Sequence, residues 1–374
     1  MMGQTLEERL GPIVERFAIP GPLVQAEVCK IGHINETYWV ICYDGRGLSR
    51  YVLQKINRHV FQNPPAVMDN LERVCRHLRN KLKQQGESQL DRRCLTLVPT
   101  RTGQFYHVDD QGEHWRVFVG IDGVRTYEAV ESPYHAREVG RAFGEFQQLL
   151  VDLPGERLHE TIPDFHHTRK RFEAFVQAVE QDPLNRARNA RAEIEFAFRH
   201  QPITGIILDA LSRGEIPERI THNDTKFNNV LMDLATDRAV AVVDLDTVMP
   251  GCVLYDFGDM VRTATSPTLE DEQDLSQVRM ELPLFRQLVE GYLSAAGSFL
   301  TSAERNLLAF AGKLITFETG LRFLTDYLLG DNYFRIHRPR HNLDRCRTQF
   351  KLVESIEQQE EVMQQVVASW NGHK

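Results

Sequence analysis

The sequence predicts an α+β protein of two lobes, a small one built on an antiparallel sheet and a larger one that is mainly helical. Short strand-like runs separated by polar or glycine-containing turns fill the first 120 residues. Helical periodicity dominates from residue 133 onwards. A chain of 374 residues with 42% hydrophobic residues can bury the cores of two lobes. We therefore assign residues 1–120 and 121–374 to the two lobes, joined by a hinge at 120–124.

The first lobe combines strands with two helices. Residues 5–17 place apolar side chains on one helical stripe, and glycine-containing turns separate the strands that follow. The predicted elements are a helix at 5–17, strands at 24–31, 37–43 and 50–56, a helix at 65–84, and strands at 95–100, 104–108 and 114–119.

The second lobe shows apolar side chains at the spacing of buried helix faces. In the segment 133–150, for example, Val139, Phe143 and Phe146 fall on one side. The predicted helices are 133–150, 165–181, 186–213, 281–297, 302–329 and 343–369.

The composition argues against several classes of protein. A net charge of −8 and a pI near 6.0 disfavour a nucleic-acid-binding protein, which needs a basic surface. The six cysteines form no Cys-x-x-Cys pair, so we expect neither a zinc site nor a disulfide framework. No apolar run approaches the roughly 18 residues of a membrane span, and the charged N-terminus is unlike a signal peptide. We expect a cytoplasmic protein with no nucleic-acid or membrane partner, and the sequence leaves its oligomeric state open.

The most informative segment is THNDTKFNN at residues 221–229. His222 lies two residues before Asp224 and Asn229 lies five after it, which is the spacing of the protein-kinase catalytic loop. The apolar run 230–232 follows, so the segment is predicted to be a turn flanked by short strands. Each polar residue alone is common in turns, but their joint spacing indicates a site of phosphoryl transfer.

A second aspartate should complete this site, and three candidates follow the loop. A hairpin over 230–243 would bring Asn229 and Asp244 to one end, where one metal ion could contact both. Asp256 begins a literal D-F-G string but lies too far along the chain for that hairpin. We therefore predict that Asp244 holds the metal and that Asp256 bonds the backbone near the catalytic loop. Asp246 is the alternative metal ligand.

The chemistry of phosphoryl transfer requires these residue types. It leaves little covalent work to the protein, so catalysis is positioning and charge neutralisation. We expect Asp224 to orient the acceptor hydroxyl and take its proton, and Lys226 to reach the transferring phosphate. Asn229 and Asp244 offer the oxygen ligands that Mg²⁺ prefers. ATP and Mg²⁺ are thus the predicted cosubstrate and cofactor.

A lysine in the first lobe is predicted to bind the phosphates. Lys55 ends the third strand, and in protein kinases the corresponding lysine pairs with a carboxylate of the following helix. We prefer Glu72 as this carboxylate, with Asp69 as the alternative. A lysine at a strand end is otherwise most often solvated.

Three further residues are candidates for nucleotide binding. Gly32 opens a turn whose backbone N–H groups could cover phosphates, although the loop lacks a three-glycine motif. Val117 and Val119 precede the hinge and would place backbone groups near an adenine. A buried edge strand has the same pattern.

Candidate contacts to the acceptor lie on the helix 302–329. Glu318, Arg322 and Asp326 are spaced four residues apart, so they could project three charges towards a polar ligand. An ion-pair ladder on the helix surface is the alternative interpretation. Tyr333 follows the same helix and is a further candidate. Weaker candidates for this site are His166, His167 and Arg169.

Five segments carry a family resemblance. They are GHINET at 32–37, THNDTKFNN at 221–229, DLDTVMPG at 244–251, YDFGD at 255–259 and ETGLRFLTDYL at 318–328. The set resembles the aminoglycoside phosphotransferase and choline kinase superfamily, and within it the N-acetylhexosamine 1-kinases. The resemblance implies a protein-kinase-like fold and ATP-dependent phosphorylation of the anomeric 1-hydroxyl of N-acetylglucosamine or N-acetylgalactosamine. It also implies that Asp224 is the base, that Asp244 and Asn229 hold Mg²⁺, and that Arg322 contacts the sugar.

Other functions stay open. An aminoglycoside or an amino alcohol such as choline would need an anionic pocket. Glu318 and Asp326 could supply it, whereas Arg322 between them favours a neutral or anionic ligand. A non-catalytic, nucleotide-binding pseudokinase is disfavoured because the predicted catalytic and metal-binding residues are all present. A metal-dependent phosphohydrolase is disfavoured because the sequence has no close cluster of His and Asp ligands.

Overall fold

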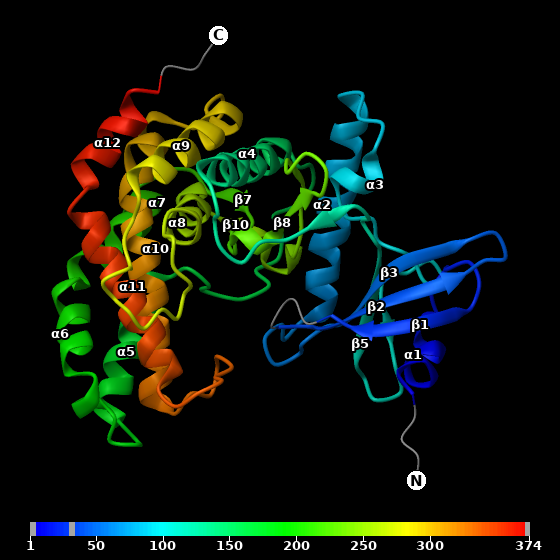
Figure 1. Cartoon of the computed structure of the whole chain (residues 1–374), viewed down its shortest axis with the longest axis horizontal. Helices are drawn as coiled ribbons and strands as arrows, with labels where there is room; N and C mark the ends of the chain where they lie inside the picture. The colour runs from blue at the N-terminus through cyan, green and yellow to red at the C-terminus, as the bar shows by residue number, and fades with distance from the viewer. Residues whose placement is uncertain (1–4, 30–33, 371–374) are drawn as a thin grey trace.

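A strand-rich lobe and a body of helices lie at opposite ends of the molecule (Figure 1). The computed structural model describes residues 5–29 and 34–370. In the first lobe, a short helix and a five-stranded antiparallel sheet accompany one long helix. Its elements are α1 (Leu6–Val14), β1 (Leu23–Val28), β2 (Glu36–Tyr43), β3 (Leu48–Lys55), α2 (Pro64–Gln84), α3 (Leu90–Arg93), β4 (His107–Val108) and β5 (His114–Val119).

The sheet, in the order β1-β2-β3-β5-β4, has two different faces. Side chains alternate along a strand, so directly paired residues share a face. Leu53 pairs with Tyr38 on one side and with Val117 on the other, and all three are buried together with Leu10 of α1. We call this the outer face. The inner face carries Phe118, which belongs to a hydrophobic cluster that runs through α2 into the second lobe.

The second lobe is mainly helical and holds two small sheets, ordered β6-β8-β9 and β10-β7. Helix α10 runs through its centre, between α5, α8 and α11 (Figure 1). Its elements are β6 (Val124–Arg125), α4 (Pro133–Leu150), α5 (Thr168–Gln181), α6 (Arg191–Arg199), α7 (Ile206–Ser212), β7 (Arg219–Thr221), β8 (Val230–Asp233), β9 (Ala239–Val242), β10 (Met249–Gly251), α8 (Val253–Ala264), α9 (Leu282–Ala296), α10 (Ser302–Leu329), α11 (His341–Glu357) and α12 (Glu360–Ala368).

Glycines allow α4 and α9 to cross at short distance. A Cβ atom on Gly291 would lie 2.0 Å from the carbonyl oxygen of Arg137, and one on Gly140 would lie 2.4 Å from that of Leu288. Real Cβ atoms do not approach backbone so closely, so the crossing requires residues without side chains. The two helices form one layer that supports the catalytic hairpin described below.

Most predicted helices and strands are present with ends shifted by a few residues, but one predicted strand is wrong. The segment 95–100 makes only two isolated bridges, between Leu97 and Phe118 and between Thr100 and Phe17. Pro99 has no N–H to donate to a ladder, which explains why the strand does not continue. The strand predicted at 104–108 shortens to the two residues of β4.

Two helix predictions also need correction, and one further helix was not predicted. The helix predicted at 186–213 is divided into α6 and α7 by a short 3₁₀ segment that contains Pro202. The helix predicted at 343–369 breaks between α11 and α12, where the Gln359 side chain donates to the carbonyl oxygens of Met280 and Ser355. Helix α8 was not predicted from the sequence.

The chain passes from the sheet to the helical lobe between β5 and β6. The predicted boundary at residue 120 falls in this segment, and its role as a hinge stays a prediction. None of the helices within residues 5–29 and 34–370 is long and apolar enough to cross a membrane.

Candidate active site

The segment 221–229 connects the two small sheets of the second lobe. It follows β7, which pairs with β10, and precedes β8, which pairs with β9. Val230 stands opposite Val242, and the N–H of Val243 donates to the carbonyl of Asn229 (2.9 Å). The predicted short strands and hairpin are therefore confirmed, and Asn229 and Asp244 lie at the same end of it.

Asp256, in the first turn of α8, organises the loop. The carboxylate is fully buried and accepts hydrogen bonds from the backbone N–H groups of His222 (2.9 Å) and Asn223 (2.7 Å) and from Gln147 (2.7 Å). Its backbone carbonyl accepts from the hydroxyl of Thr225 (2.6 Å). Burial raises the pKa of Asp256 above its ordinary value. The prediction that Asp256 bonds the backbone near the catalytic loop is confirmed.

The two residues that precede Asp224, His222 and Asn223, bind the loop to the hairpin and to the segment that follows it. Asn223 has a left-handed backbone (φ 65°), which Asn tolerates better than most residues, and its side chain donates to the carbonyl of Thr247 (2.9 Å). Nε2 of His222 lies 2.9 Å from the carbonyl of Val243, and Nδ1 accepts from the N–H of Asp224 (3.3 Å). The loop is thus held from both sides, and Asp224 lies in a fixed backbone frame.

Asp224 is half-buried between two polar partners. Nζ of Lys226 lies 3.0 Å from its carboxylate, and Nδ2 of Asn229 lies 3.2 Å from it. Burial alone would raise the pKa of Asp224, but the charge and hydrogen bond of Lys226 together with the nearby His222 and Arg262 lower that pKa. Burial would likewise lower the pKa of Lys226, but Asp224, Glu270 and Asp259 outweigh it and raise that pKa. At neutral pH both groups are therefore charged, and Asp224 can accept a proton.

Asp244 has an unusual backbone and an uncompensated charge. Its φ is 60°, and the side chain is exposed. Although solvent reaches it, the protein surrounding the carboxyl group and the charges of Asp246 and Asp224 raise the pKa of Asp244 to about 6. Its carboxylate makes no hydrogen bond or ion pair with any residue the structure describes, and Oδ1 of Asn229 likewise accepts none from these residues. Two open oxygen donors in a negative field fit a magnesium ion.

This donor set is small. In the part of the chain that the structure describes, no group of three or more His, Cys, Asp or Glu side chains comes together for a metal. Magnesium commonly takes one or two protein ligands and completes its coordination with phosphate oxygens and water. Asp244 and Asn229 fit that arrangement.

Asp246, the alternative metal ligand, is engaged elsewhere. Its two carboxylate oxygens bind the guanidinium of Arg116, one of them at 2.8 Å, and Oδ2 also accepts from Nδ2 of Asn35 (2.7 Å). Asp246 and Arg116 are each only 2% exposed. Because both oxygens already have partners, the geometry favours Asp244 for the metal.

The predicted ion pair of Lys55 is wrong. Lys55 pairs with Glu36 on the neighbouring strand. Glu72 and Asp69 instead pair with arginines of their own helix, at 2.9 and 3.6 Å. The register explains the difference, since Lys55 stands opposite Glu36 and Trp115 and so lies on the outer face, away from α2.

On the inner face, the cation at this level of the sheet is an arginine. Arg116 pairs across the strands with Gln54, whose Oε1 accepts from Nε (3.0 Å) and from a terminal nitrogen (2.8 Å). Lys55 itself lines a cavity of about 580 Å³ together with Arg58 and His59. Phosphate binding by Lys55 stays a prediction.

The other nucleotide candidates are only partly placed. Gly32 lies outside the described residues. Val117 is buried on the outer face, and its carbonyl accepts from the N–H of Val98 (2.9 Å). The N–H of Val119 donates to Thr96 (2.9 Å). Those two backbone groups are therefore satisfied within the sheet, and contact with an adenine stays a prediction.

Glu318 is buried and joins α10 to the catalytic loop through a histidine. It accepts from the hydroxyl of Thr168 and lies 2.7 Å from Nδ1 of His166, whose Nε2 lies 3.0 Å from the carbonyl of Asn223. Both ring nitrogens face acceptors, so the imidazole carries both protons. Burial alone would lower the pKa of His166, but the charge and hydrogen bond of Glu318, with the hydrogen bond to the carbonyl of Asn223, together raise that pKa.

Arg322, one turn beyond Glu318, lies among aromatic rings. Its guanidinium carbon is 5.1 Å from the ring centre of Phe165, 5.5 Å from that of Phe334 and 5.9 Å from that of Tyr333. Within residues 5–29 and 34–370 the guanidinium makes no hydrogen bond or ion pair. Burial, and then the charge of Arg322, lower the pKa of Arg171, so a second cation is close by. The site has an excess of positive charge.

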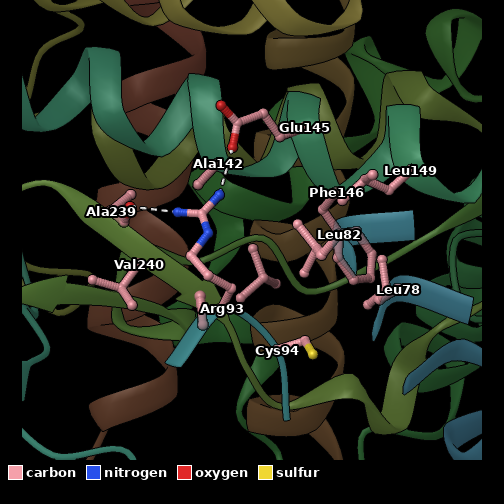
Figure 2. Close-up of a pocket in the computed structure, with 12 residues that line it drawn as sticks. Leu78, Leu82, Arg93, Cys94, Ala142, Glu145, Phe146, Leu149, Ala239 and Val240 are labelled. Carbon is pink, nitrogen blue, oxygen red and sulfur yellow. Dashed lines mark hydrogen bonds and ion pairs between the residues drawn. The ribbon is translucent and has the colours of Figure 1, made fainter. Parts of the chain in front are cut away.

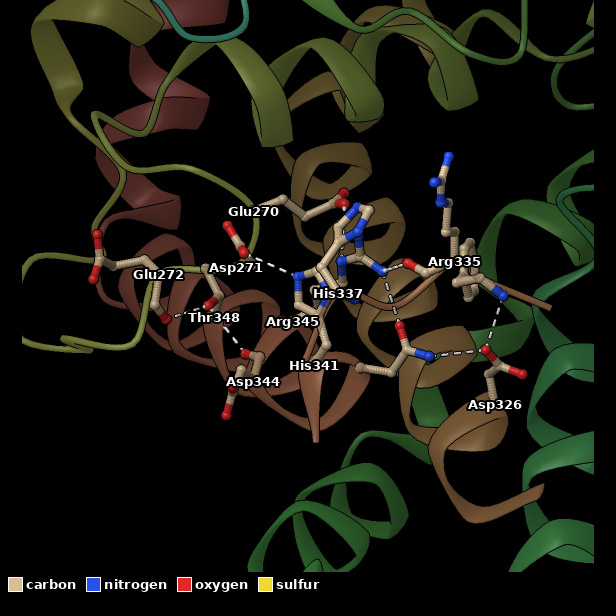
Figure 3. A network of polar contacts seen from close by, with 12 residues as sticks. Glu270, Asp271, Glu272, Asp326, Arg335, His337, His341, Asp344, Arg345 and Thr348 are labelled. Carbon is tan, nitrogen blue, oxygen red and sulfur yellow. Dashed lines mark hydrogen bonds and ion pairs between the residues drawn. The ribbon is translucent and has the colours of Figure 1, made fainter. Parts of the chain in front are cut away.

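Asp326 was predicted to project towards a polar ligand, but it faces the backbone of the turn after α10. It is buried and accepts from the backbone N–H groups of residues 332–334 (2.8–2.9 Å) and from Asn342 (2.9 Å), so it holds the turn after α10. Figure 3 shows Asp326 in this network. Among the described residues, neither Glu318 nor Asp326 pairs with Arg322, so the ion-pair ladder is also wrong.

Of the weaker candidates, only His166 reaches the site. His167 caps α5 by accepting from the N–H of Lys170 (3.3 Å). Arg169 pairs with Asp209 at the surface (2.7 Å). Tyr333 is 56% exposed beside Arg322, as a side chain at the mouth of an acceptor site should be.

The loop between α8 and α9 lies against the first turn of α11 (Figure 3). Asp271 binds Arg338 (2.8 Å) and Nε2 of His341 (2.9 Å), which fasten the loop to α11. Glu270 in the same loop binds Arg262 (2.6 Å). These contacts hold Glu270 where its charge acts on Lys226.

A small cavity lies behind the hairpin and is not the active site. Figure 2 shows it between α2, α4 and β9, with Arg93 bound to Glu145 and to the carbonyl of Ala239 at its edge. Its volume of about 40 Å³ suits a water molecule, not a nucleotide.

Sequence analysis missed two contributors, Arg116 and Asn35, and did not assign the role of His166. Arg116 offered a signal, since it stands in a run of apolar residues within a strand. A charge in such a position needs a buried partner. Asn35 and His166 gave no comparable signal, because their partners are distant in sequence.

Comparison with known proteins identifies the family. Residues 25–292, well over half of the chain, match the model described as the phosphotransferase enzyme family. The chain belongs to this family. The family match confirms the predicted superfamily and the general class of small-molecule kinase that transfers a phosphoryl group to an alcohol.

Solved structures share the family fold. The microcompartment-associated aminopropanol kinase is 15% identical and has a TM-score of 0.58, covering 95% of this chain and 98% of that one. An aminoglycoside phosphotransferase from Alicyclobacillus acidocaldarius is 13% identical, with a TM-score of 0.58 and 98% of each chain covered. A spectinomycin phosphotransferase, solved with ADP and spectinomycin, is 11% identical, with a TM-score of 0.54 and coverage of 96% and 99%. The predicted two-lobed, protein-kinase-like fold is confirmed.

Proposed function

We propose that this phosphotransferase uses ATP and Mg²⁺ to phosphorylate the anomeric 1-hydroxyl of an N-acetylhexosamine. The observation that carries the proposal is the guanidinium of Arg322, which is ringed by aromatic side chains and makes no hydrogen bond or ion pair among the described residues. It lies one turn beyond Glu318 on α10, and Glu318 is joined to the catalytic loop through His166. A sugar offers apolar faces to such rings and oxygen atoms to such a cation.

The charge of the site separates the possible acceptors. Two of the similar proteins are named for aminopropanol and aminoglycosides, which are alcohols that carry amino groups, and an ammonium group needs an anionic pocket. Here Glu318 is neutralised by protonated His166, and Asp326 is used by backbone N–H groups. Arg322 and Arg171 leave a positive excess. A neutral, oxygen-rich acceptor fits this charge better than an amine does.

The reaction needs one proton transfer and one displacement. Asp224 accepts the proton of the 1-hydroxyl as its oxygen forms a bond to the γ-phosphorus. The bond from that phosphorus to the β–γ bridging oxygen breaks, and ADP leaves with its electron pair. Lys226 lies beside Asp224 and would stabilise the negative charge of the transferring group. Magnesium, held by Asp244 and Asn229, would supply further charge neutralisation when bound.

The first experiment is ADP release across a panel of acceptors with Mg²⁺ and ATP. The panel contains N-acetylglucosamine, N-acetylgalactosamine, their 1-O-methyl glycosides, choline, aminopropanol and an aminoglycoside. We expect turnover with the free N-acetylhexosamines and none with the methyl glycosides. Turnover only with amines would overturn the sugar assignment while keeping the kinase. Nucleotide binding without turnover of any acceptor would indicate a pseudokinase.

A pair of arginine variants tests the acceptor site itself. Arg322→Met should raise the KM for the sugar about 10–100-fold, because a charged hydrogen bond is worth about 1.5–3 kcal/mol, and leave the KM for ATP unchanged. Arg169→Met is the matched control, since Arg169 is a surface cation on the adjacent helix α5 that pairs with Asp209. Equal effects of the two variants would contradict a direct contact between Arg322 and the acceptor.

A further inference from the structure

Asp246 connects the two lobes through hydrogen bonds. It lies two residues after Asp244, in the second lobe, while both of its partners lie in the first. Arg116 on β5 binds both carboxylate oxygens. Asn35, which lies immediately before β2, binds one of them (2.7 Å). The metal-binding loop is therefore hydrogen-bonded directly to the sheet.

The same contacts extend through the first lobe. Gln54 on β3 accepts two hydrogen bonds from Arg116, at 2.8 and 3.0 Å. Oδ1 of Asn35 accepts from the N–H of Asn57, in the loop between β3 and α2 (3.0 Å). One carboxylate thus connects β3, β5 and the segments before β2 and after β3. We call Asp246, Arg116, Asn35 and Gln54 the interlobe network.

The ion pair in this network is buried, so the loss of either partner should have a large effect. Arg116 and Asp246 are each 2% exposed, and the guanidinium also lies 5.2 Å from the ring centre of Phe118. A buried ion pair adds little net stability, but removing one partner leaves the other charge without compensation. We therefore expect this pair to fix the relative position of the groups that it joins more than it raises the stability of the fold. The geometry in question is that of the loop that carries Asp244.

Helix α2 contacts the same loop through a neutral hydrogen bond, from Asn70 to the carbonyl of Val248 (3.1 Å), but among the described residues it provides no ion pair to it. In protein kinases a lysine on the third strand pairs with a glutamate of the following helix, and this pair aligns the two lobes. Here Lys55 is on the outer face, and Glu72 and Asp69 are taken by arginines of α2. The inner-face cation, Arg116, pairs with the metal loop instead.

We propose that Arg116 and Asn35 are positioning residues that align the first lobe with the metal-binding loop by holding Asp246. The interlobe network takes the part that a strand–helix ion pair takes in protein kinases. The proposal rests on kinase activity but not on which acceptor is used. Neither residue needs to touch a substrate, since both act through Asp246 on the position of Asp244.

The test compares four single variants of the full-length protein and the Arg116→Met/Asn35→Ala double variant by steady-state kinetics and by hydrogen exchange of the segment 244–251. Arg116→Met removes the ion pair, and Arg116→Lys keeps the charge without bidentate geometry. Asn35→Ala removes the hydrogen bond to Asp246 and the one from Asn57, at a half-buried residue that should tolerate the change. Arg347→Met is the matched control, because it breaks a partly buried ion pair with Glu193 (2.6 Å) that joins α11 to α6 inside the second lobe.

We expect Arg116→Met and Asn35→Ala to lower kcat about 10–100-fold and about threefold or more, respectively, since small displacements of reacting groups have effects of this size. Exchange in 244–251 should rise in both. The double variant should be less than additive because both side chains act on Asp246. Arg116→Lys should be intermediate. Arg347→Met should lower the unfolding temperature while kcat stays within twofold of wild type.

Two outcomes would overturn the proposal. One is an Asn35→Ala variant with wild-type kcat and wild-type exchange in 244–251. The other is an Arg116→Lys variant that is less stable but has unchanged kcat, which would show a structural role alone. Hydrogen exchange needs no turnover, so failure of the alignment proposal is distinguishable from failure to find the acceptor.

Discussion

Charged side chains in this molecule fall into two groups, those whose hydrogen-bonding capacity is used within the fold and those that stay open. Asp256, Asp246 and Asp326 belong to the first group, because each accepts at least three hydrogen bonds from protein donors. Asp244 and Arg322 belong to the second within the described residues. Open charges of opposite sign at two places suit a metal–nucleotide complex and an oxygen-rich acceptor.

Asp224→Asn tests the base at the scale of one residue. The amide keeps the shape of the side chain but cannot accept the proton, so turnover should fall about 10²–10⁴-fold. The affinity for ATP should stay within a few-fold, since Asp224 is assigned to the acceptor. ADP release and calorimetric titration with nucleotide measure the two effects. A variant with the wild-type rate would rule out Asp224 as the base.

His166 should make stability depend on pH. Its pKa is raised in the folded state, so its contribution is complete below the ordinary value of about 6.5 and is lost as the pH rises through the raised pKa. The difference in unfolding free energy between wild type and His166→Gln should therefore be larger at pH 6 than at pH 9. Urea titrations at both values measure it. A pH-independent difference would mean that the imidazole is neutral.

At the scale of elements, short loops are positioned by helices that pack unusually closely. The catalytic loop is bonded to the first turn of α8 through Asp256 and to α4 through Gln147. Helix α4 in turn crosses α9 at Gly140 and Gly291. The placement of Asp224 therefore depends on helix packing far from any ligand.

Gly291→Ala tests this crossing. The added methyl group would meet the backbone of Arg137 at 2.0 Å, so the helices must separate. Overpacking of this kind costs about 1–3 kcal/mol, which thermal or denaturant unfolding should detect. Gly11→Ala in α1 is the matched control, because nothing lies within 4 Å of its Cβ. There the replacement should stabilise the protein by about 0.4–1 kcal/mol. Similar effects at both positions would contradict the close crossing.

At the scale of the whole molecule, the two lobes share one hydrophobic cluster through α2 and several ion pairs, of which the pair between Arg116 and Asp246 is the most buried. Their relative position is therefore built into the fold before any ligand binds. Nucleotide and metal would add the missing contacts between the phosphates and the open oxygens of Asp244 and Asn229.

Binding of nucleotide and metal should thus be coupled in stability. ADP with Mg²⁺ at 100 times its Kd should stabilise the protein by about 2.7 kcal/mol, and chelation of the metal should remove most of that gain. Asp244→Ala should lose the magnesium-dependent part, whereas Asp209→Ala, which removes a surface carboxylate paired with Arg169, should keep it. Thermal unfolding with and without EDTA measures the gain. A gain of equal size in the presence of EDTA would argue against this metal site.

The sequence by itself determined what is local. Periodicity and turn residues specified most helices and strands, and the spacing within 221–229 and 230–243 specified the catalytic loop and hairpin, because neighbours in sequence are neighbours in space there. The tertiary structure decided the rest. The face on which Lys55 lies depends on strand register, and the partners of Glu318, Asp326 and Arg116 come from distant segments. Which charges are satisfied and which stay open is a property of three-dimensional packing, and no single segment contains it.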